Sequence, residues 1–440
     1  MSAVGAKSTA SPVERYQATF EARWQGNDEL TTLRRAALAQ FLSAGFPTQR
    51  DEAWKYTNLR RLETRSFTPA EATALDAHQP DWLTTEGTRI ALVNGHWLPA
   101  LSSQNAQPPG VTVLTLKQWI QHEPAAVAAY LKEHDQLGGN ALEQLNLAFF
   151  EDGVVVNLAD DVVLDHPVYI VHQTTNSAAQ RMSHPRIVVR IGRNSRATLL
   201  EHYLGSSETE YFTNAVTRFQ IAAGGAVKHF RIQQEAPRAF HIGHVQARLA
   251  RDARYSIHDI ALGASLGRSG ITALLEGSGS HAAMFGLFTP MGNQHLDAHT
   301  RLDHIAAHTT SEEDYRGIAS GRSRGVFNGK IIVRPDAQKI DSRQSSRNLL
   351  LSPSAEIDTK PELEIYANDV KCSHGATTGQ LDATALFYLR SRGLSESDAR
   401  AALIRAFAES ILSTIDLAPV HAALEQQIDE RFKLVNEAKA

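Results

Sequence analysis

The residues best suited to chemistry stand two positions apart near the C-terminal end of the chain: Cys372 and His374, in the stretch KCSHG. In an extended strand, residues i and i+2 share a face, so this thiol and imidazole could meet one ligand, as a dyad for thiol catalysis would require. Cys372 is the only cysteine. That excludes an internal disulfide, a CxxC zinc site and a four-thiolate iron–sulfur site built by this chain alone. The simpler alternative is a small buried thiol beside an unrelated histidine.

Four histidines close together form a second candidate group: His295, His299, His304 and His308, with Asp297 and Asp303 between them. Imidazole and carboxylate groups together could hold zinc or iron. The stretch lies in a β-rich region, where an offset of four keeps two residues on one face of a strand. His295/His299 and His304/His308 would then form two same-face pairs. The alternative is a polar ladder on a solvated sheet face, and no HExxH-type signature favours the metal site.

Other classes of chemistry lack their signatures. There is no GxSxG elbow for a nucleophilic triad. Residues 263–269 resemble a phosphate loop only superficially, because the glycines are too close and an arginine replaces the lysine. The arginines between Arg316 and Arg347 alternate with glycine and serine and have few aromatic neighbours, so we expect no nucleic-acid groove. A net charge of −4 and a charged fraction of 21% likewise disfavour a general polyanion binder or a disordered chain.

The hydropathy of the chain points to the cytoplasm. No segment reaches the roughly 18 uncharged apolar residues that a membrane span needs. The first residues, MSAVGAKSTASPVERY, contain no apolar signal core. We therefore expect a cytoplasmic protein with no membrane span.

A weak repeat organises the region from residue 151 to 378, which must position Cys372 and His374. Short β-rich runs end on an apolar residue and are followed by a small or polar turn. These terminal residues are Leu158, Ile191, Ile221, Leu249, Leu275, Ile305 and Val333, spaced 26 to 33 residues apart. A repeat of this length predicts one supersecondary unit that buries its apolar face by stacking on its neighbours. The pattern favours a parallel β-helix, with an antiparallel sandwich as the alternative.

Helical periodicity flanks this core on both sides. Residues 13–24, 29–42 and 116–150 carry apolar residues at helical spacing, with a break at Gly138 and Gly139, and residues 99–110 read as a connector. After the core, Asp382 and Ser395 are predicted helix N-caps, and Pro419 introduces a last helix. We therefore expect an N-terminal helical domain with connector (1–150), a β-helix core (151–378) and a C-terminal helical domain (379–440).

Several long motifs, in this order and spacing, resemble one family. They are WKYT at 54–57, GKIIVRPDAQK at 329–339, QSSRNLLLS at 344–352, PELEIYANDVKCSHGATTG at 361–379 and ALFYLRSRGL at 385–394. Together they resemble the SufB/SufD family of the SUF iron–sulfur cluster assembly system. The single cysteine and the KCSHG stretch are more similar to the SufD branch than to the SufB branch, whose members carry more cysteines.

The resemblance implies a mainly β fold, a right-handed parallel β-helix between N- and C-terminal helical domains. It also implies a non-catalytic scaffold subunit of a SufBCD complex. Such a subunit pairs with a SufB-like paralogue through the C-terminal part of the β-helix, and with a SufC-like ABC ATPase that supplies ATP hydrolysis. The complex builds and transfers nascent clusters, with sulfur that comes indirectly from a cysteine desulfurase.

The same resemblance assigns expected roles to single residues. His374 matches the family histidine at the SufB interface, and Cys372 matches the motif cysteine, so both are expected at a shared site for iron or a transient iron–sulfur cluster. The region that docks the ATPase matches roughly residues 386–415, in which we expect partner contacts from Leu386, Leu403, Phe407 and Ile411. A flavin has been proposed for such assemblies, but no feature of this sequence identifies a flavin site.

Two alternatives of another class remain open from the sequence. A parallel β-helix also suits enzymes that act on polysaccharides, although those are usually secreted. A stand-alone metal-dependent enzyme could be built on the four histidines between His295 and His308.

Overall fold

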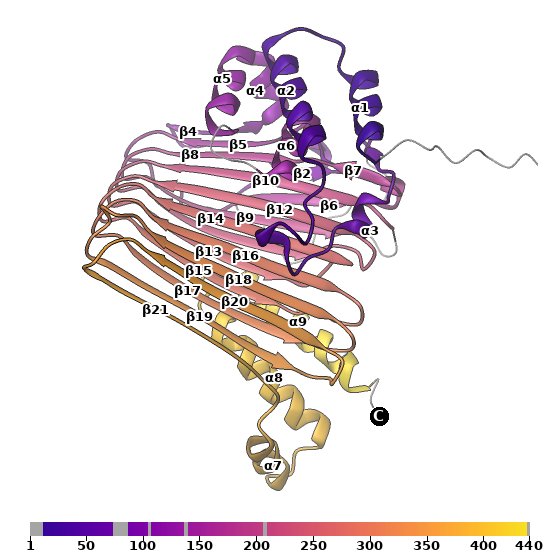
Figure 1. The fold of residues 1–440 in the computed structure, drawn as a ribbon, viewed down its shortest axis with the longest axis vertical. Helices are drawn as coiled ribbons and strands as arrows, with labels where there is room; N and C mark the ends of the chain where they lie inside the picture. Colours follow the sequence, from indigo (N-terminus) through magenta and orange to yellow (C-terminus); the bar gives the residue numbers. More distant parts are fainter. Residues whose placement is uncertain (1–11, 74–86, 104–106, 136–139, 206–208, 438–440) are drawn as a thin grey trace, which may run out of the picture.

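Two long sheets of parallel strands form the centre of the molecule in the computed structural model (Figure 1). The structure describes residues 12–73, 87–103, 107–135, 140–205 and 209–437. The chain alternates between the sheets and so winds up a flattened β-helix. The stacked strands of sheet A are β5 (Gly153–Leu158), β8 (Arg186–Ile191), β10 (Phe212–Ile221), β12 (Phe240–Leu249), β14 (Leu266–Leu275), β16 (His295–His304), β18 (Arg324–Val333) and β20 (Glu356–Ile365). Those of sheet B are β6 (Val168–Thr174), β9 (Arg196–Gly205), β11 (Ala226–Gln234), β13 (Arg254–Ala261), β15 (His281–Phe288), β17 (Thr310–Ala319), β19 (Ile340–Leu350) and β21 (Val370–Gly379).

Each turn lies in register on the next, so equivalent residues form columns along the solenoid. The residues predicted to end each repeat make one such column: Leu158, Ile191, Ile221, Leu249, Leu275 and Val333. The solenoid prediction is therefore confirmed. It is wrong by one residue at a single turn, where His304 takes the column position and Ile305 lies just beyond the strand, 38% exposed.

Alternation along the strands creates an inner and an outer face on each sheet. Inward apolar side chains such as Ile187, Phe219 and Leu275 pack into one buried core between the sheets. A single turn cannot bury this face alone, so stacking of turns is what removes it from water and holds the solenoid together.

The N-terminal segment covers the outer face of sheet A. Its helices are α1 (Pro12–Arg23), α2 (Glu29–Ala44), α3 (Arg60–Glu63), α4 (Leu116–His122), α5 (Pro124–Asp135) and α6 (Ala141–Phe149), with short 3-10 turns η1 (Glu52–Trp54) and η2 (Pro99–Leu101). Their buried side chains, among them Phe41 and Phe149, pack against outward residues of sheet A such as Phe212 and Phe240. The three predicted helical regions are thus present, while the predicted break at residues 138 and 139 lies outside the described residues.

Short strands of the same segment extend the solenoid. They are β1 (Thr68–Pro69), β2 (Thr88–Val93), β3 (His96–Trp97) and β4 (Val111–Thr115), and a further short strand, β7 (Arg181–Ser183), precedes the 10-residue rungs. A third 3-10 turn, η3 (Asn176–Ala178), lies just before β7. Strand β2 pairs in parallel with β6, whereas β4 pairs antiparallel with β5. The first 150 residues therefore close the N-terminal end of the β-helix as well as supplying helices.

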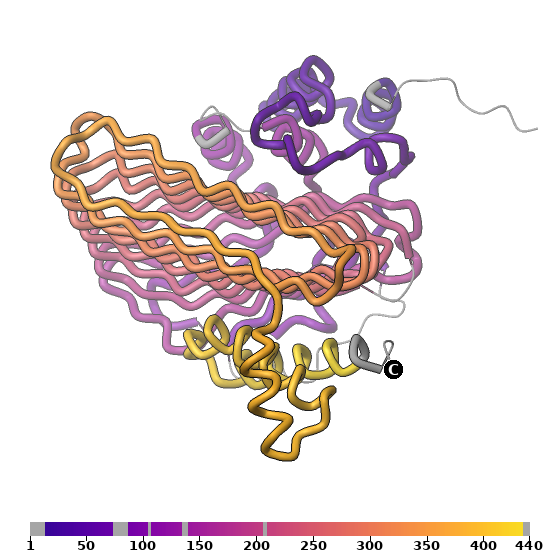
Figure 2. Tube along the Cα trace, turned by 60° about the horizontal axis from the view of Figure 1, so that its bottom comes forward, coloured from indigo at the N-terminus to yellow at the C-terminus, as the bar shows by residue number. Residues whose placement is uncertain are grey.

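The C-terminal segment covers the opposite side, the outer face of sheet B (Figure 2). Helices α8 (Glu396–Leu412) and α9 (Ala418–Glu437) pack on this face, whereas α7 (Ala383–Ser391) extends away from the solenoid. The predicted caps are confirmed: the Asp382 carboxylate accepts from the first-turn amide of Thr384, and the Ser395 hydroxyl accepts from the amide of Asp398. No helix in the described part of the chain is both long and apolar enough to cross a bilayer.

Candidate functional site

Cys372 and His374 lie on β21, the last strand of sheet B. This strand pairs with β19 in parallel, and the register sets Ser342 beside Cys372 and Gln344 beside His374. Ser342 and Gln344 are buried inside the solenoid. Because residues in register on neighbouring strands share a face, Cys372 and His374 continue these two inward columns onto the final rung. The prediction that the thiol and the imidazole share one face of a strand is therefore confirmed.

This final rung is open. In the described part of the chain, β21 pairs only with β19, and β20 pairs only with β18, so both sheets end in an unpaired strand edge. The Cys372 thiol packs partly against the apolar interior, and His374 is exposed. Burial, helped by the negative charge of Asp341, raises the pKa of the Cys372 thiol. Its thiolate, the form that binds metals and attacks electrophiles, is therefore disfavoured at neutral pH.

A buried carboxyl group lies two turns beneath His374 in the same column. Gln344 is in register with both His374 and Glu313, and its side-chain amide donates to the Glu313 carboxyl group over 2.6 Å. Glu313 is fully buried and has no basic partner among the described residues. This burial raises its pKa to about 7, although Thr300 and Gln344 partly oppose the shift. Near neutral pH the group is thus poised between a proton donor and an acceptor.

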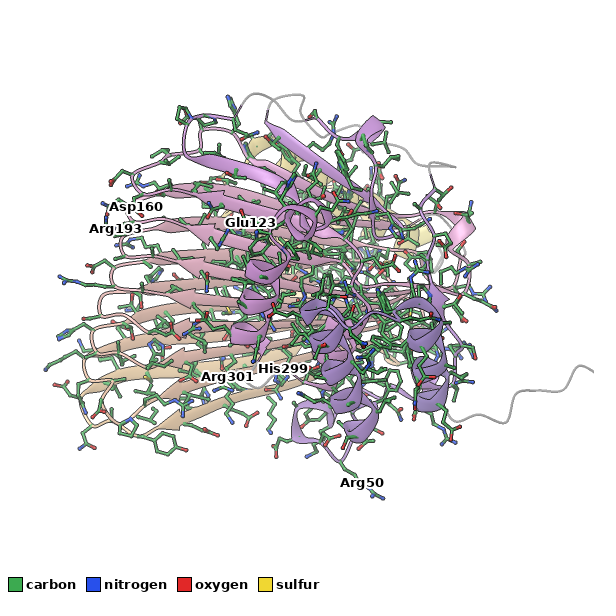
Figure 3. All side chains as sticks on the ribbon, turned by 90° about the horizontal axis from the view of Figure 1, so that it is seen from above. Arg50, Glu123, Asp160, Arg193, His299 and Arg301 are labelled. Carbon is green, nitrogen blue, oxygen red and sulfur yellow. The ribbon has the colours of Figure 1, made fainter. Side chains whose placement is uncertain are left out.

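The four clustered histidines occupy separate environments. His295 and His299 share the outer face of β16, as predicted, and the hydroxyl of Thr57 lies 2.9 Å from the His295 ring (His299 is labelled in Figure 3). His304 points inward and bonds Thr309 and Ser311 at 2.7 and 3.0 Å. The predicted His304/His308 pair is wrong, because His308 sits in the turn after the strand with a φ of 60°.

Converging metal ligands are absent from the part of the chain that the structure describes: no three His, Cys, Asp or Glu side chains gather closely enough to hold an ion. This holds for the histidines of β16 and for Cys372 and His374 alike. A stand-alone metal enzyme built on the four histidines therefore has no geometric support here.

The four residues expected to contact a partner differ in exposure. Leu386 on α7 and Leu403 and Phe407 on α8 are half-buried, and Phe407 packs against the core beneath α8. Ile411 is fully buried in that core. The open apolar surface lies on α7 instead, where Phe387 is 73% and Tyr388 is 56% exposed.

Comparison with known proteins decides the family. Residues 172–407 match the model of the SUF system FeS cluster assembly SufBD core domain, and residues 16–170 match that of the SufBD N-terminal region. The chain is 32% identical to an iron–sulfur cluster assembly SufBD family protein of Synechocystis, over 92% of both chains. It is 31% identical to the iron–sulfur cluster assembly protein SufD of Escherichia coli, over 93% of this chain and 94% of the relative. The chain belongs to the SufBD family.

Other relatives are more distant. A SufBD family protein of Mycobacterium tuberculosis is 25% identical over 88% of this chain and 90% of its own length. The family resemblance drawn from the sequence motifs is thus confirmed, and with it a place in SUF-system iron–sulfur cluster assembly.

Sequence reasoning missed a charged network inside this SufBD solenoid. Arg231 donates to Asp259 at 2.8 Å and to Ser269 at 3.1 Å, and its guanidinium contacts His241. Burial alone would lower the pKa of Arg231, but the carboxylate of Asp259, together with Tyr203 and Glu201, raises it. Glu201 lies beside Arg231 on the neighbouring strand β9, and its carboxyl group is 3.0 Å from the buried ring of His229. The only hint in the sequence is that these charges fall at inward positions of strands that also carry inward apolar residues, such as Leu199, Val227 and Ile257.

The role of the WKYT motif of this SufBD chain also emerges only from the fold. Trp54 is buried beneath the guanidinium of Arg268, which lies 4.0 Å from the ring centroid. Thr57 donates to Asp297, and Asp297 also pairs with Arg268. The motif therefore anchors the N-terminal segment to the outer face of β14 and β16.

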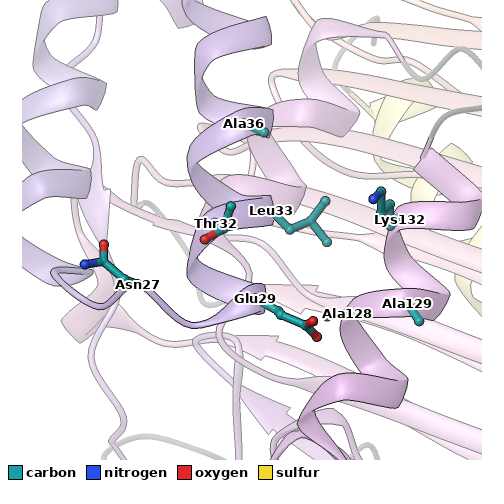
Figure 4. A pocket seen from close by; sticks show the side chains of 8 residues that line it. All are labelled: Asn27, Glu29, Thr32, Leu33, Ala36, Ala128, Ala129 and Lys132. Carbon is teal, nitrogen blue, oxygen red and sulfur yellow. The ribbon is translucent and has the colours of Figure 1, made fainter.

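A groove of about 550 Å³ separates α2 from α5 (Figure 4). It is lined by short and apolar side chains together with Glu29 and Lys132. Its one acidic and one basic residue leave no net charge, so the groove has no electrostatic preference for anions or for cations.

Glu313 makes the stability of this SufBD chain depend on pH. The folded-state pKa of about 7 exceeds the ordinary value of 4.5, so the folded state holds the proton more tightly than the unfolded state. The contribution is fully present below pH 4.5 and is lost as pH rises through about 7. We expect Glu313→Gln to raise the free energy of unfolding relative to wild type at pH 8, by about 3 kcal/mol at most, and far less at pH 5. Urea unfolding at the two pH values measures this.

Glu312→Gln is the matched control, because Glu312 is the exposed neighbour on the same strand. It should leave the difference between pH 5 and pH 8 as in wild type. An equal effect of both variants would contradict the role given to Glu313.

Proposed function

We propose that this chain is a non-catalytic subunit of an iron–sulfur cluster assembly scaffold, which pairs with a SufB-type paralogue and a SufC-type ABC ATPase. The observation that carries the proposal is the open final rung, which bears Cys372 and His374 and ends both sheets in unpaired edges. Unpaired parallel edges are templates for a further β-strand surface. A paralogue of the same fold, docked end to end, would satisfy them and would face both side chains.

At such a joint, His374 is the better iron ligand of the two. A neutral imidazole binds iron without losing a proton, whereas the Cys372 thiol must first ionise against its raised pKa. Two ligands do not complete a cluster site, so thiolates of the cysteine-richer paralogue would supply the others. The growing cluster is then cargo shared between two subunits. The complex would act in the cytoplasm, where the single thiol stays reduced.

The ATPase-docking part of the proposal rests on α7 and α8. Phe387 and Tyr388 form an exposed apolar surface on α7, a helix with no buried residue of its own. Such a surface marks a protein contact. Leu386 on α7 and Leu403 and Phe407 on α8 are half-buried, and Ile411 supports α8 from within the core. ATP hydrolysis would be supplied by the partner.

Contacts beneath α8 would connect the ATPase to the cluster site. Arg316 on β17 donates to Ser410 on α8 at 3.1 Å, and the His258 ring on β13 lies 2.9 Å from the hydroxyl of Thr414. Strand β17 pairs with β19, which pairs with β21. A displacement of α8 by the ATPase would therefore move the sheet whose last strand carries His374, a rigid-body form of coupling.

Co-purification tests the proposal. The tagged full-length chain, co-expressed with SufB-type and SufC-type subunits, is expected to retain both. Phe387→Ser should reduce capture of the ATPase about tenfold, because it removes the most exposed aromatic ring, and should leave the paralogue bound. Gel-resolved recovery from the affinity column is the measurement.

Val163→Ser is the control. Val163 is also an exposed apolar residue, but it precedes β6 and is far from α7 in the sequence. It should change neither recovery. Failure of the wild-type chain to retain either subunit would sink the proposal, and loss of the paralogue in Phe387→Ser would contradict the separation of the two surfaces.

A further inference from the structure

A cavity of about 610 Å³ opens where three parts of the chain meet. The N-terminal segment contributes Arg61 and Arg65 from and beside α3, the corner loops of the solenoid contribute Glu210 and Arg238, and α9 contributes Arg431. None of these residues belongs to the open rung or to the exposed face of α7. The cavity is therefore separate from the surfaces used in the proposed function.

The charge of this cavity is strongly positive. Four arginines line it, and Glu210 is the one carboxylate among the described lining residues, which leaves a net charge of +3. Glu210 neutralises Arg65 at 2.8 Å. The guanidinium groups of Arg61, Arg238 and Arg431 line the same cavity, and none of them forms an ion pair with a carboxylate of the described residues.

Arg431 is the most buried of these cations. Its guanidinium donates to the backbone carbonyl of Thr289 and to the side-chain oxygen of Gln294, each at 2.8 Å, and both acceptors are neutral. Burial without an opposing carboxylate lowers the pKa of Arg431 to about 10. A cation removed from water with only neutral partners is costly unless an anion joins it.

The surrounding groups hold this arrangement in place. The oxygen of Gln294 also accepts from the Met291 amide at 2.9 Å, and its nitrogen donates to the Ala264 carbonyl at 2.8 Å. Arg61, which also lines the cavity, donates to the Ser265 hydroxyl at 2.9 Å. Arg238 is exposed, and its side chain is free to turn toward a ligand. Arg431 and Arg61 are thus each held by hydrogen bonds, whereas Arg238 can adjust to a ligand.

We propose that this cavity binds a phosphate-bearing small molecule of up to nucleotide size. Guanidinium forks match the oxygens of phosphate in paired hydrogen bonds. A phosphate monoester brings about 1.5 to 2 negative charges, so a diphosphate group suits a net charge of +3 better than a single carboxylate does. The volume lies within the range of roughly 300 to 1,000 Å³ that is usual for small-molecule sites.

Calorimetric titration of the full-length chain tests this inference. Inorganic pyrophosphate and ADP, each in chloride buffer without magnesium, are expected to bind saturably with one site per chain. Arg238→Gln should weaken both about tenfold, because it removes one charge-assisted contact. This side chain is exposed, so folding should be unaffected, as a thermal unfolding midpoint would verify.

Arg50→Gln provides the matched control, since Arg50 is exposed on the N-terminal segment, points away from the molecule in Figure 3 and does not line the cavity. It should leave both affinities within about twofold of wild type. Absence of saturable binding, equal weakening by the two variants, or tighter binding of citrate than of pyrophosphate would each overturn the inference. The readout is binding to the chain alone, so it is independent of cluster assembly.

Discussion

Replacement of His374 by alanine is expected to reduce cluster formation roughly tenfold or more in an assembly reconstituted with SufB-type and SufC-type subunits. The imidazole is exposed on the final inward column of the solenoid, where a partner subunit can reach it. The neighbouring Cys372 thiol cannot easily take over, because burial raises its pKa. Cluster yield is measured by visible absorbance and by iron and sulfide content per complex.

Ser373→Ala is the matched control for this experiment. Ser373 lies between the two residues on the same strand, is exposed, and points to the opposite face. It should leave cluster yield unchanged. Unchanged yield in His374→Ala, with the complex intact on size-exclusion chromatography, would refute the assigned role of His374, whereas dissociation of the complex would make it a docking residue instead.

The second large effect is expected from the charged network inside the solenoid. Asp259→Asn should lower the free energy of unfolding by about 3–5 kcal/mol, because Arg231 then keeps its charge in the buried interior without the carboxylate that offsets it. Both side chains are almost fully buried, so neither can be solvated by water in the folded state. Urea unfolding, followed by circular dichroism and tryptophan fluorescence, measures the loss.

Two further variants separate the pair from general destabilisation. Asp259→Leu combined with Arg231→Met removes both charges and should recover most of the loss, since apolar replacements of a buried pair are often tolerated. Asp160→Asn breaks the exposed pair with Arg193, at 2.8 Å on a surface turn (Figure 3), and should have little effect. Equal losses in Asp259→Asn and Asp160→Asn would contradict the importance of burial.

The architecture was largely predictable because its signal is local. Each repeat ends on an apolar residue that is followed by a loop of small or polar residues. The spacing of these apolar residues predicted the stacked columns that the structure contains. The single error, Ile305 instead of His304, has a physical reason. His304 bonds Thr309 and Ser311 inside the solenoid, so a polar side chain is buried where the pattern predicts an apolar one.

Helix caps and the relation of Cys372 to His374 were predictable for the same reason. Both depend on residues within three positions of each other, whose geometry follows from backbone periodicity. The sequence alone therefore determined a stacked β-helix, its flanking helices and a thiol and imidazole on one face. Motif resemblance added the family, which the comparisons confirm.

Only the tertiary structure decided which distant groups meet. The pairing of Arg231 with Asp259, the column from Glu313 to His374 and the arginine-lined cavity all join residues that are one or more turns, or a whole domain, apart in sequence. Their meeting depends on the register of stacked turns and on where the N- and C-terminal segments dock, which no local pattern encodes. Burial sets their charges and pKa values, and burial is a property of the assembled fold.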